Sequence, residues 1–283
     1  MNTRSSPPIG HGQYTRSAMY RQRGLTLVEL MVSLGLSLVL IAAVGAVFLA
    51  SNQASRTAQD GARIQETGRY ALDLIGRNLR QAGYTNISAA VANTAFPGTP
   101  IKNVTTACPS AFTIQYQGIV GELDCQAQSI ATGEIVQHTF FIGVDATTSI
   151  PSLRCNAVKN TTPWTPPTTC PTAAAGALDN ILLDNIEDLR ILYGSDTDGD
   201  QAADSYAATP ADWTKVVTAR VCVLVRSESP GSVSSPQTYL NCDGVLGIAA
   251  SDVARFTTAT DTRQRRAFAA TFALRNRLFG TPN

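Results

Sequence analysis

The sequence predicts an α+β fold in which one long N-terminal helix packs on a head of antiparallel β-sheet. Three observations lead to this prediction: an uncharged apolar run, a helical pattern that continues from it, and short strand-like segments between turn-rich loops. The chain has 283 residues, of which 44% are hydrophobic, so it can bury a proper core. Its net charge of +1 creates no global field that would recruit nucleic acid or an acidic substrate. Function must therefore be sought in local motifs.

The apolar run extends from Leu30 to Ala50 and contains no charged side chain. At about 1.5 Å per residue, a helix of this length crosses the hydrocarbon core of a bilayer, which is about 30 Å thick. The segment from Met1 to Gly24 carries four arginines and no acidic residue, so the positive-inside rule keeps the N-terminus in the cytoplasm and places the head outside. A secretory signal peptide is the alternative, but its apolar region would be shorter and would end at a small-residue cleavage site.

One carboxylate, Glu29, directly precedes this run, five residues after Gly24. A charged side chain inside a membrane costs a few kcal/mol or more and therefore needs a partner. A simple signal anchor explains the length and orientation of the run, but it leaves Glu29 unexplained.

The stretch RGLTLVEL, residues 23–30, resembles the class III signal of type IV pilins and pseudopilins: a glycine, a hydrophobic residue, three more residues, then glutamate. The resemblance implies that a prepilin peptidase cuts between Gly24 and Leu25 and that the new amine of Leu25 is methylated. Leu25 stands where phenylalanine is commoner in the family. Glu29 becomes the fifth mature residue, and the resemblance implies that it meets the N-terminal amine of a neighbouring subunit, where the two charges offset each other.

The helical pattern continues beyond the apolar run. Apolar or small residues recur at three- and four-residue steps on one face: Ile64, Gly68, Ala71, Leu72, Ile75, Leu79 and Ala82. Gly83 follows as a C-cap. Gly61, Gly68 and Gly76 weaken a helix and leave a kink or local melting open. The expected organisation is a leader over 1–24, a transmembrane and polymerisation helix over 25–50, an amphipathic continuation over 51–83 and a β-rich head over 84–283.

Six segments of the head are predicted strands: Phe112 to Tyr116, Ile135 to Ile142, Leu189 to Tyr193, Val216 to Arg226, Tyr239 to Asn241, and Ala267 to Leu274. The stretch from Thr161 to Gly176, rich in proline, threonine and alanine, is predicted to be an exposed loop.

All six cysteines fall in the part expected outside the cytoplasm, where an even count predicts disulfides. Nearest-neighbour pairing is the simplest connectivity: Cys108 with Cys125, Cys155 with Cys170, and Cys222 with Cys242. A metal site is a poorer interpretation, because no close CxxC pair occurs and the only histidines are His11 and His138. His138 lies among strand residues and is expected to be structural.

An acidic stretch, YGSDTDGDQAADSY over residues 193–206, is the second local motif with chemistry in it. Asp196, Asp198, Asp200 and Asp204 occupy positions 1, 3, 5 and 9 of a calcium-loop pattern, in which the carbonyl of Ala202 can add a ligand. Position 6 is Gln201 instead of glycine, and position 12 is Ala207 instead of glutamate. Calcium is therefore a candidate ligand, and a solvated acidic hairpin turn is the alternative.

An enzyme is not expected, because the sequence has no Walker loop, no GxSxG elbow and no HExxH motif. The C-terminal arginines Arg263, Arg265, Arg266, Arg275 and Arg277 could contact DNA phosphates. They are more simply explained as the solvated side of a last strand whose apolar side is Phe268, Ala270, Phe272 and Leu274.

Beyond its signal, the chain resembles the PilW-type minor pilins of Gram-negative bacteria. Four short islands carry this resemblance: GRYA at 68–71, LRQAGY at 79–84, YGSDTDGD at 193–200 and ALRN at 273–276. It implies a minor pilin of the inner membrane that joins other minor pilins and the major pilin through the assembly machinery. Such a minor pilin helps to initiate pilus assembly and is incorporated at or near the tip, where a tip adhesin is a further candidate partner. Through the pilus it would support twitching motility, adhesion or DNA uptake.

Two other functions stay open. A J-like pseudopilin of a type II secretion tip complex would share the signal, the helix and the head. A surface module would bind DNA or a receptor through the head itself, and DNA binding would weaken steeply with salt.

Overall fold

The computed structural model describes residues 24–85, 99–104, 108, 110–131, 133–145, 147–160 and 181–275. The chain divides into two compact units, Met1–Ser51 and Asn52–Asn283. The expected leader lies almost wholly outside the described residues, as does the predicted loop from Thr161 to Gly176.

The first element is helix α1, Leu27–Gln81, which continues through both units as one helix of 55 residues. It runs through Gly61, Gly68 and Gly76 without a break, so the helix does not end where these glycines weaken it. Gly83 adopts a left-handed backbone with φ of 77°, as a C-terminal cap requires, and its N–H donates to the carbonyl of Gln115 at 2.8 Å. The helix end is therefore tied directly to the head.

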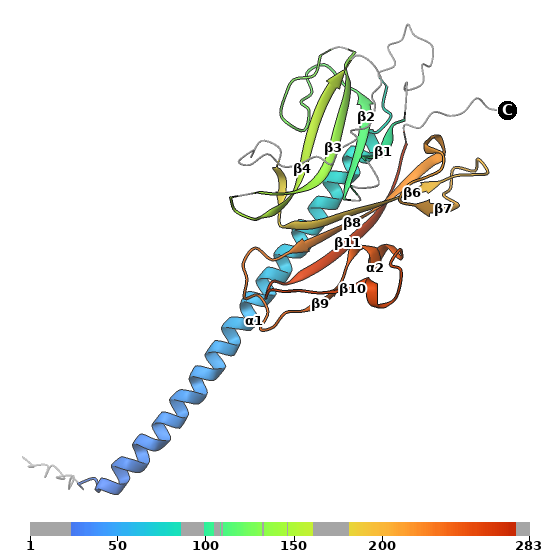
Figure 1. The fold of residues 1–283 in the computed structure, drawn as a ribbon. Coiled ribbons are helices and arrows are strands. Elements are labelled where there is room, and N and C mark those ends of the chain that lie inside the picture. Colours follow the sequence, from blue (N-terminus) through green and yellow to red (C-terminus); the bar gives the residue numbers. More distant parts are fainter. Residues whose placement is uncertain are drawn as a thin grey trace, which may run out of the picture. The chain divides into compact units, whose positions relative to one another are not determined.

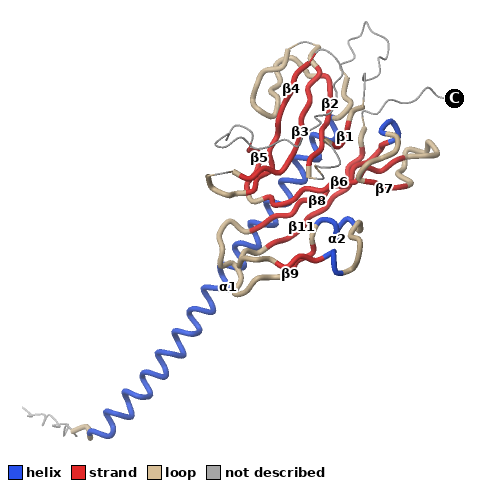
Figure 2. Tube along the Cα trace, viewed as in Figure 1, coloured by secondary structure: helices blue, strands red, loops and turns tan. Residues whose placement is uncertain are grey.

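The head contains two larger antiparallel sheets (Figures 1 and 2). The five-stranded sheet has the order β1 (Ile101–Asn103), β2 (Ala111–Gln117), β3 (Ile135–Val144), β4 (Pro151–Asn160), β5 (Ile181–Asp184). The four-stranded sheet has the order β11 (Arg265–Ala273), β8 (Val216–Arg226), β6 (Ile186–Ser195), β7 (Ser205–Ala207). Strands β9 (Thr238–Leu240) and β10 (Phe256–Thr258) form a small third sheet, and α2 (Cys242–Leu246) follows β9. Two 3₁₀ turns span Trp213–Lys215 and Val253–Arg255.

One hydrophobic core joins the second half of α1 to both larger sheets. Ile75 and Leu79 of the helix are fully buried in the same cluster as Phe112 of β2 and Val223 of β8. Figure 1 shows this part of α1 lying against the strands. The predicted α+β fold, a long helix on an antiparallel sheet head, is therefore confirmed, as is the predicted apolar face of the helix.

All six predicted strands lie within or overlap observed ones, but β1, β4, β5, β7 and β10 and the helix α2 were not predicted. The longest of these, β4, begins at a proline and carries Arg154 and Lys159, so it lacks the alternation that marks a strand. Arg154 is nevertheless fully buried, beside Ser152 and Asp145. A buried charged residue of this kind hides a strand from a hydrophobicity pattern.

The glycines of α1 form a seam against strand β11. A Cβ at Gly68 would lie 2.3 Å from the ring of Phe268, and one at Gly76 would lie 2.3 Å from the ring of Phe272. The two rings therefore occupy the space that the side chain of any residue other than glycine at positions 68 and 76 would need. At Gly61, by contrast, a Cβ would meet only the amide of Gln264, at 3.5 Å or more.

We predict that Gly68→Ala will destabilise the head by about 1–3 kcal/mol, because the added methyl group overlaps the ring of Phe268. Gly61→Ala is the matched control: it should be neutral or stabilising by up to about 1 kcal/mol, because alanine is the better helix former and the space is free. Urea denaturation of the two variants measures both effects. Equal stabilities would show that the seam does not constrain the helix.

Candidate functional site

The motif predicted to be cleaved lies at the start of α1 and contains a helix cap. The Oε2 atom of Glu29 accepts hydrogen bonds from the Thr26 N–H at 3.0 Å and from the Thr26 hydroxyl at 3.1 Å. In return, the Glu29 N–H donates to the Thr26 Oγ1 at 3.3 Å. This reciprocal pair is a capping box, with threonine at the cap and glutamate three residues later. Glu29 thus has a local structural role that the sequence interpretation did not consider.

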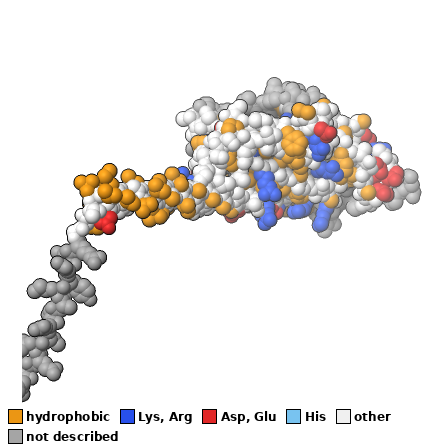
Figure 3. Space-filling model, turned by 90° about the horizontal axis from the view of Figure 1, so that it is seen from below, with side chains coloured by type: hydrophobic (Ala, Val, Ile, Leu, Met, Phe, Trp, Pro, Cys, Tyr) orange, Lys and Arg blue, Asp and Glu red, His pale blue; other side chains and the backbone are white. Residues whose placement is uncertain are grey.

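The apolar half of α1 is solvent-exposed along its whole length in this single chain. Every residue from Gly24 to Asn52 is exposed, including a series of large hydrophobic side chains such as Leu36 at 68% and Phe48 at 64%. Figure 3 shows hydrophobic side chains covering this segment. In the described part of the chain, α1 is the one helix long and apolar enough to cross a membrane, a test that a signal sequence would also pass. Such a surface requires lipid or other subunits to cover it.

The acidic motif forms the loop of the β6–β7 hairpin, in which Ser195 pairs with Ser205. Ligand atoms of Asp196, Asp198 and Asp204 lie within 4.8 Å of one another, whereas the fourth predicted ligand, Asp200, is not part of this group. The Oδ1 atom of Asp200 instead accepts the Ala202 N–H at 2.7 Å. The structure therefore brings three of the four predicted carboxylates together.

Loop hydrogen bonds already use these carboxylates. The two oxygens of Asp196, a residue only 4% exposed, accept the N–H groups of Gly199 at 2.6 Å and Gln201 at 2.9 Å. The Oδ2 atom of Asp204 accepts the hydroxyl and the N–H of Thr197, both at 2.6 Å, and these bonds lower the pKa of Asp204. The donor set suits a hard cation, but the hairpin also closes through its own hydrogen bonds, so calcium binding stays a prediction.

The disulfides differ from nearest-neighbour pairing. Cys125 is bonded to Cys155, so the expected pairs of Cys108 with Cys125 and of Cys155 with Cys170 are wrong. The reason is spatial: the loop before β3 folds back over the β3–β4 hairpin and brings Cys125 beside β4. Cys108 is also disulfide-bonded, and Cys170 lies outside the described residues.

The expected pair of Cys222 and Cys242 is confirmed. It ties α2 to the centre of the four-stranded sheet, where both sulfurs are buried with Leu192, Leu224 and Leu246. A cross-link over 20 or 30 residues stabilises a fold by about 3–4 kcal/mol through chain entropy.

His138 connects the helix to the disulfide loop. It is 4% exposed; its Nε2 accepts the Cys125 N–H at 3.2 Å, and its Nδ1 lies 3.2 Å from the Oδ1 of Asn78 on α1. Both contacts are satisfied only by a neutral ring that carries its proton on Nδ1. Burial lowers the pKa of His138 to about 4, against the opposing effect of nearby Asp124. His138 is therefore a structural residue in this geometry.

The C-terminal arginines have mixed environments. Arg265 makes two-pronged contacts with both Glu187 and Asp261, and these hydrogen bonds lower the pKa of Asp261 to about 2. Arg263 donates to the carbonyls of Ser227 and Glu228. Arg263 thus links the segment before β11 to the residues that follow β8, and Arg265 links the start of β11 to Glu187 of β6, which their sequence positions alone did not show. Arg266 and Arg275 are exposed, and Arg277 lies outside the described residues.

Comparison with known proteins agrees with these features. The family model of the "Type IV Pilus-assembly protein W", PilW, matches residues 139–276, and the model of the "Prokaryotic N-terminal methylation motif" matches residues 19–45. The chain thus carries a PilW match over residues 139–276 of its head and a prepilin-type methylation motif at its N-terminus. Among solved structures, the "Type IV-like pilin TTHA1219 from Thermus thermophilus" is similar, with 14% identity and a TM-score of 0.47 over 76% of this chain and 96% of that chain. No curated protein matches the chain.

The PilW match runs from β3 to the end of β11, so it includes the acidic hairpin and the helix-facing phenylalanines. The methylation motif includes Gly24, Leu25 and Glu29. The two matches thus fall on the two parts of the chain that the sequence resemblance distinguished: a processed, apolar N-terminus and a β-rich head.

We predict that acid will destabilise the head through His138. The folded pKa of about 4 lies below the ordinary value of 6.5, so between these values the unfolded chain binds more protons and stability falls as pH falls. The loss amounts to roughly 2–3 kcal/mol across this window. His138→Gln keeps one donor and one acceptor but does not titrate. Urea denaturation at pH 7 and pH 4.5 should show a smaller pH effect in this variant; an equal effect would contradict the assignment.

The calcium hypothesis predicts that millimolar calcium raises the melting temperature of the protein. Binding at a hundred times the dissociation constant would add about 2.7 kcal/mol. Asp198→Asn should abolish the increase, whereas Asp200→Asn, outside the gathered group, should retain more of it. Differential scanning fluorimetry with and without a chelator makes the measurement. An unchanged wild-type melting temperature would show that the hairpin closes through hydrogen bonds alone.

Proposed function

We propose that this chain is a minor pilin that helps to initiate type IV pilus assembly and is built into the pilus at or near its tip. The observation that carries the proposal is the conjunction of a prepilin signal, a first half of α1 that is apolar and exposed at every residue, and a head of the PilW type. The helix supplies a surface that must be covered, and the signal supplies a cleavage point that frees its end. Twitching motility, adhesion and DNA uptake would follow as outputs of the whole pilus.

The proposed partners and location follow from the same features. Prepilin peptidase cuts after Gly24 and methylates Leu25, and the inner-membrane assembly machinery then passes the subunit to other minor pilins and the major pilin. Before assembly the N-terminus lies in the cytoplasm and the head in the periplasm, because the basic residues precede the apolar run. The protein acts as a structural subunit whose chemistry is that of processing and assembly.

Glu29 is proposed to act twice during this process. In the single chain it caps α1 through Thr26. In a filament it would contact the new amine of a neighbouring Leu25, where a positive charge offsets its own in apolar surroundings. The first role needs only a hydrogen-bond acceptor, whereas the second needs a negative charge.

A J-like pseudopilin of a type II secretion system is the second candidate, because such a subunit would carry the same signal and helix. Deletion of the gene separates the two functions: loss of pili and twitching supports the minor pilin, whereas loss of secretion with intact pili supports the pseudopilin. DNA or receptor binding by the head is a third candidate. The pairing of Arg263 and Arg265 within the fold argues against those two arginines as phosphate ligands.

We predict that mature protein from membranes begins at Leu25 with a methylated amine, as intact mass measurement would show. An uncut leader in cells with active prepilin peptidase would contradict the signal assignment.

We further predict that Glu29→Ala and Glu29→Gln will both be cleaved yet enter sheared pili at strongly reduced levels. Glutamine can still accept the Thr26 N–H, so it removes the charge while keeping the cap. Thr26→Ala is the reverse control, because it weakens the cap and keeps the charge. Immunoblots of sheared filaments measure incorporation. Normal incorporation of Glu29→Gln with failure of Thr26→Ala would show that capping, not charge pairing, explains Glu29.

A further inference from the structure

Strand β11 is an edge of the four-stranded sheet, with β8 as its only hydrogen-bonded neighbour among the described strands. The direction of its peptide groups follows from the register. Ser227 N–H donates to the Gln264 carbonyl and Leu274 N–H to the Val217 carbonyl, so even-numbered residues of β11 point their peptide groups toward β8. The odd-numbered residues Ala267, Ala269, Thr271 and Ala273 therefore direct theirs away from the sheet.

These outward peptide groups have no hydrogen-bond partner among the described residues. Ala269, Thr271 and Ala273 are also exposed, so no described residue covers them. Natural edge strands are usually protected by proline, by an inward charge, by a bulge or by short length. From Ala267 to Ala273 this edge has none of these protections: it is regular in register and carries only alanine, phenylalanine and threonine.

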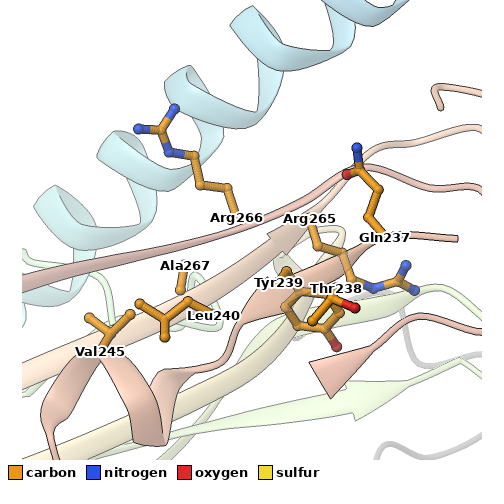
Figure 4. Close-up of a pocket in the computed structure, with 8 residues that line it drawn as sticks. All are labelled: Gln237, Thr238, Tyr239, Leu240, Val245, Arg265, Arg266 and Ala267. Carbon is orange, nitrogen blue, oxygen red and sulfur yellow. The ribbon is translucent and has the colours of Figure 1, made fainter. Parts of the chain in front are cut away.

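A groove continues the edge at its N-terminal end. It has a volume of about 510 Å³ and is lined by β9 on one side and by the start of β11 on the other (Figure 4). On β9, the pairing of Gln237 and Asn241 with β10 directs their peptide groups to that strand, so those of Thr238 and Leu240 face the opposite way. The groove is thus bordered by two strands that each lack a neighbour on that side among the described strands.

The charge around this edge is positive. Figure 4 shows Arg266 directed toward α1, where its guanidinium lies 5.7 Å from the ring centroid of Phe268. Arg80 of α1 lies 5.8 Å from the ring of Phe272, and Arg220, the cross-strand partner of Thr271, lies over Tyr206. Arg266 forms no ion pair with any described residue. No acidic residue occurs between Gln264 and Arg275.

We infer that β11 binds an extended acidic segment of another pilus subunit by β-strand addition, with one end of that segment in the groove beside β9. The added strand would satisfy the outward peptide groups, and its carboxylates would face Arg266. A second copy of this chain fits worse, because pairing two β11 edges would bring like charges together. This inference rests on the proposed function, since it needs a neighbouring subunit, and it adds the chemistry by which the head recognises that neighbour.

The test places the photo-cross-linker p-benzoylphenylalanine at Ala273 of the full chain in its native cells, with cross-linked peptides identified by mass spectrometry. Both the membrane fraction and sheared filaments are analysed. The expected product joins position 273 to an extended, acidic segment of another subunit in at least one fraction. That product in membranes, with the chain absent from filaments, would contradict tip incorporation while supporting strand addition.

Two variants test whether the cross-link depends on hydrogen bonding through the β11 edge. Thr271→Pro removes an outward N–H and obstructs the edge, while proline is tolerated on the free side of an edge strand. Thr271→Ala is the matched control that keeps the N–H. We expect about fivefold to tenfold less cross-link with proline and near-normal yield with alanine, provided both variants melt like the parent. Arg266→Glu should also reduce the yield.

Three results would overturn the inference: cross-links only to a second copy, cross-links only to residues 276–283 of the same chain, or no cross-link in either fraction. Equal yields from Thr271→Pro and Thr271→Ala would likewise exclude pairing through this edge.

Discussion

The close contact between the glycines of α1 and the phenylalanines of β11 constrains the rest of the head. Gly68 and Gly76 leave no room for a side chain beneath Phe268 and Phe272, so the strand can approach the helix backbone directly. That approach fixes β11, which pairs with β8, which pairs in turn with β6. The same helix face buries Ile75 and Leu79 against both larger sheets, so neither sheet has a complete core without it.

One helix therefore serves two surroundings. Its first half is exposed in the single chain and needs lipid or subunits to cover it, and its second half is the core of the head. The methylation motif at the N-terminus and the core of the head thus belong to the same helix, α1. The head adds rigid tethers of its own: the Cys222–Cys242 disulfide, the Arg265 clamp and the neutral His138 contact with Asn78. Of these tethers, the Arg265 clamp also holds the start of β11 in place.

Sequence reasoning found what depends on local pattern. The helix face, the class III motif, six of the strands and the helix-facing side of β11 all follow from periodicity or from fixed spacing. Sequence reasoning failed for features that tertiary contacts determine. Cys125 pairs with Cys155 because a loop folds back. Strand β4 lacks the alternating pattern of a strand because Arg154 within it is buried. Asp200 accepts the N–H of Ala202 instead of joining the other aspartates. The glycines of α1 are visible in the sequence, but their partners Phe268 and Phe272 lie about two hundred residues further along the chain, so the sequence marks them only as weak points of the helix.

The central claim is that the second half of α1 is the core of the head and not an attached stalk. Native-state hydrogen exchange of the full chain in detergent tests it most directly, because it measures the opening free energy of each amide. Amides from Ile64 to Leu79 should exchange only through global unfolding, with the same free energy and the same denaturant dependence as the central strand β8. Exchange of this helical segment by local opening, well below the free energy measured for β8, would contradict the account.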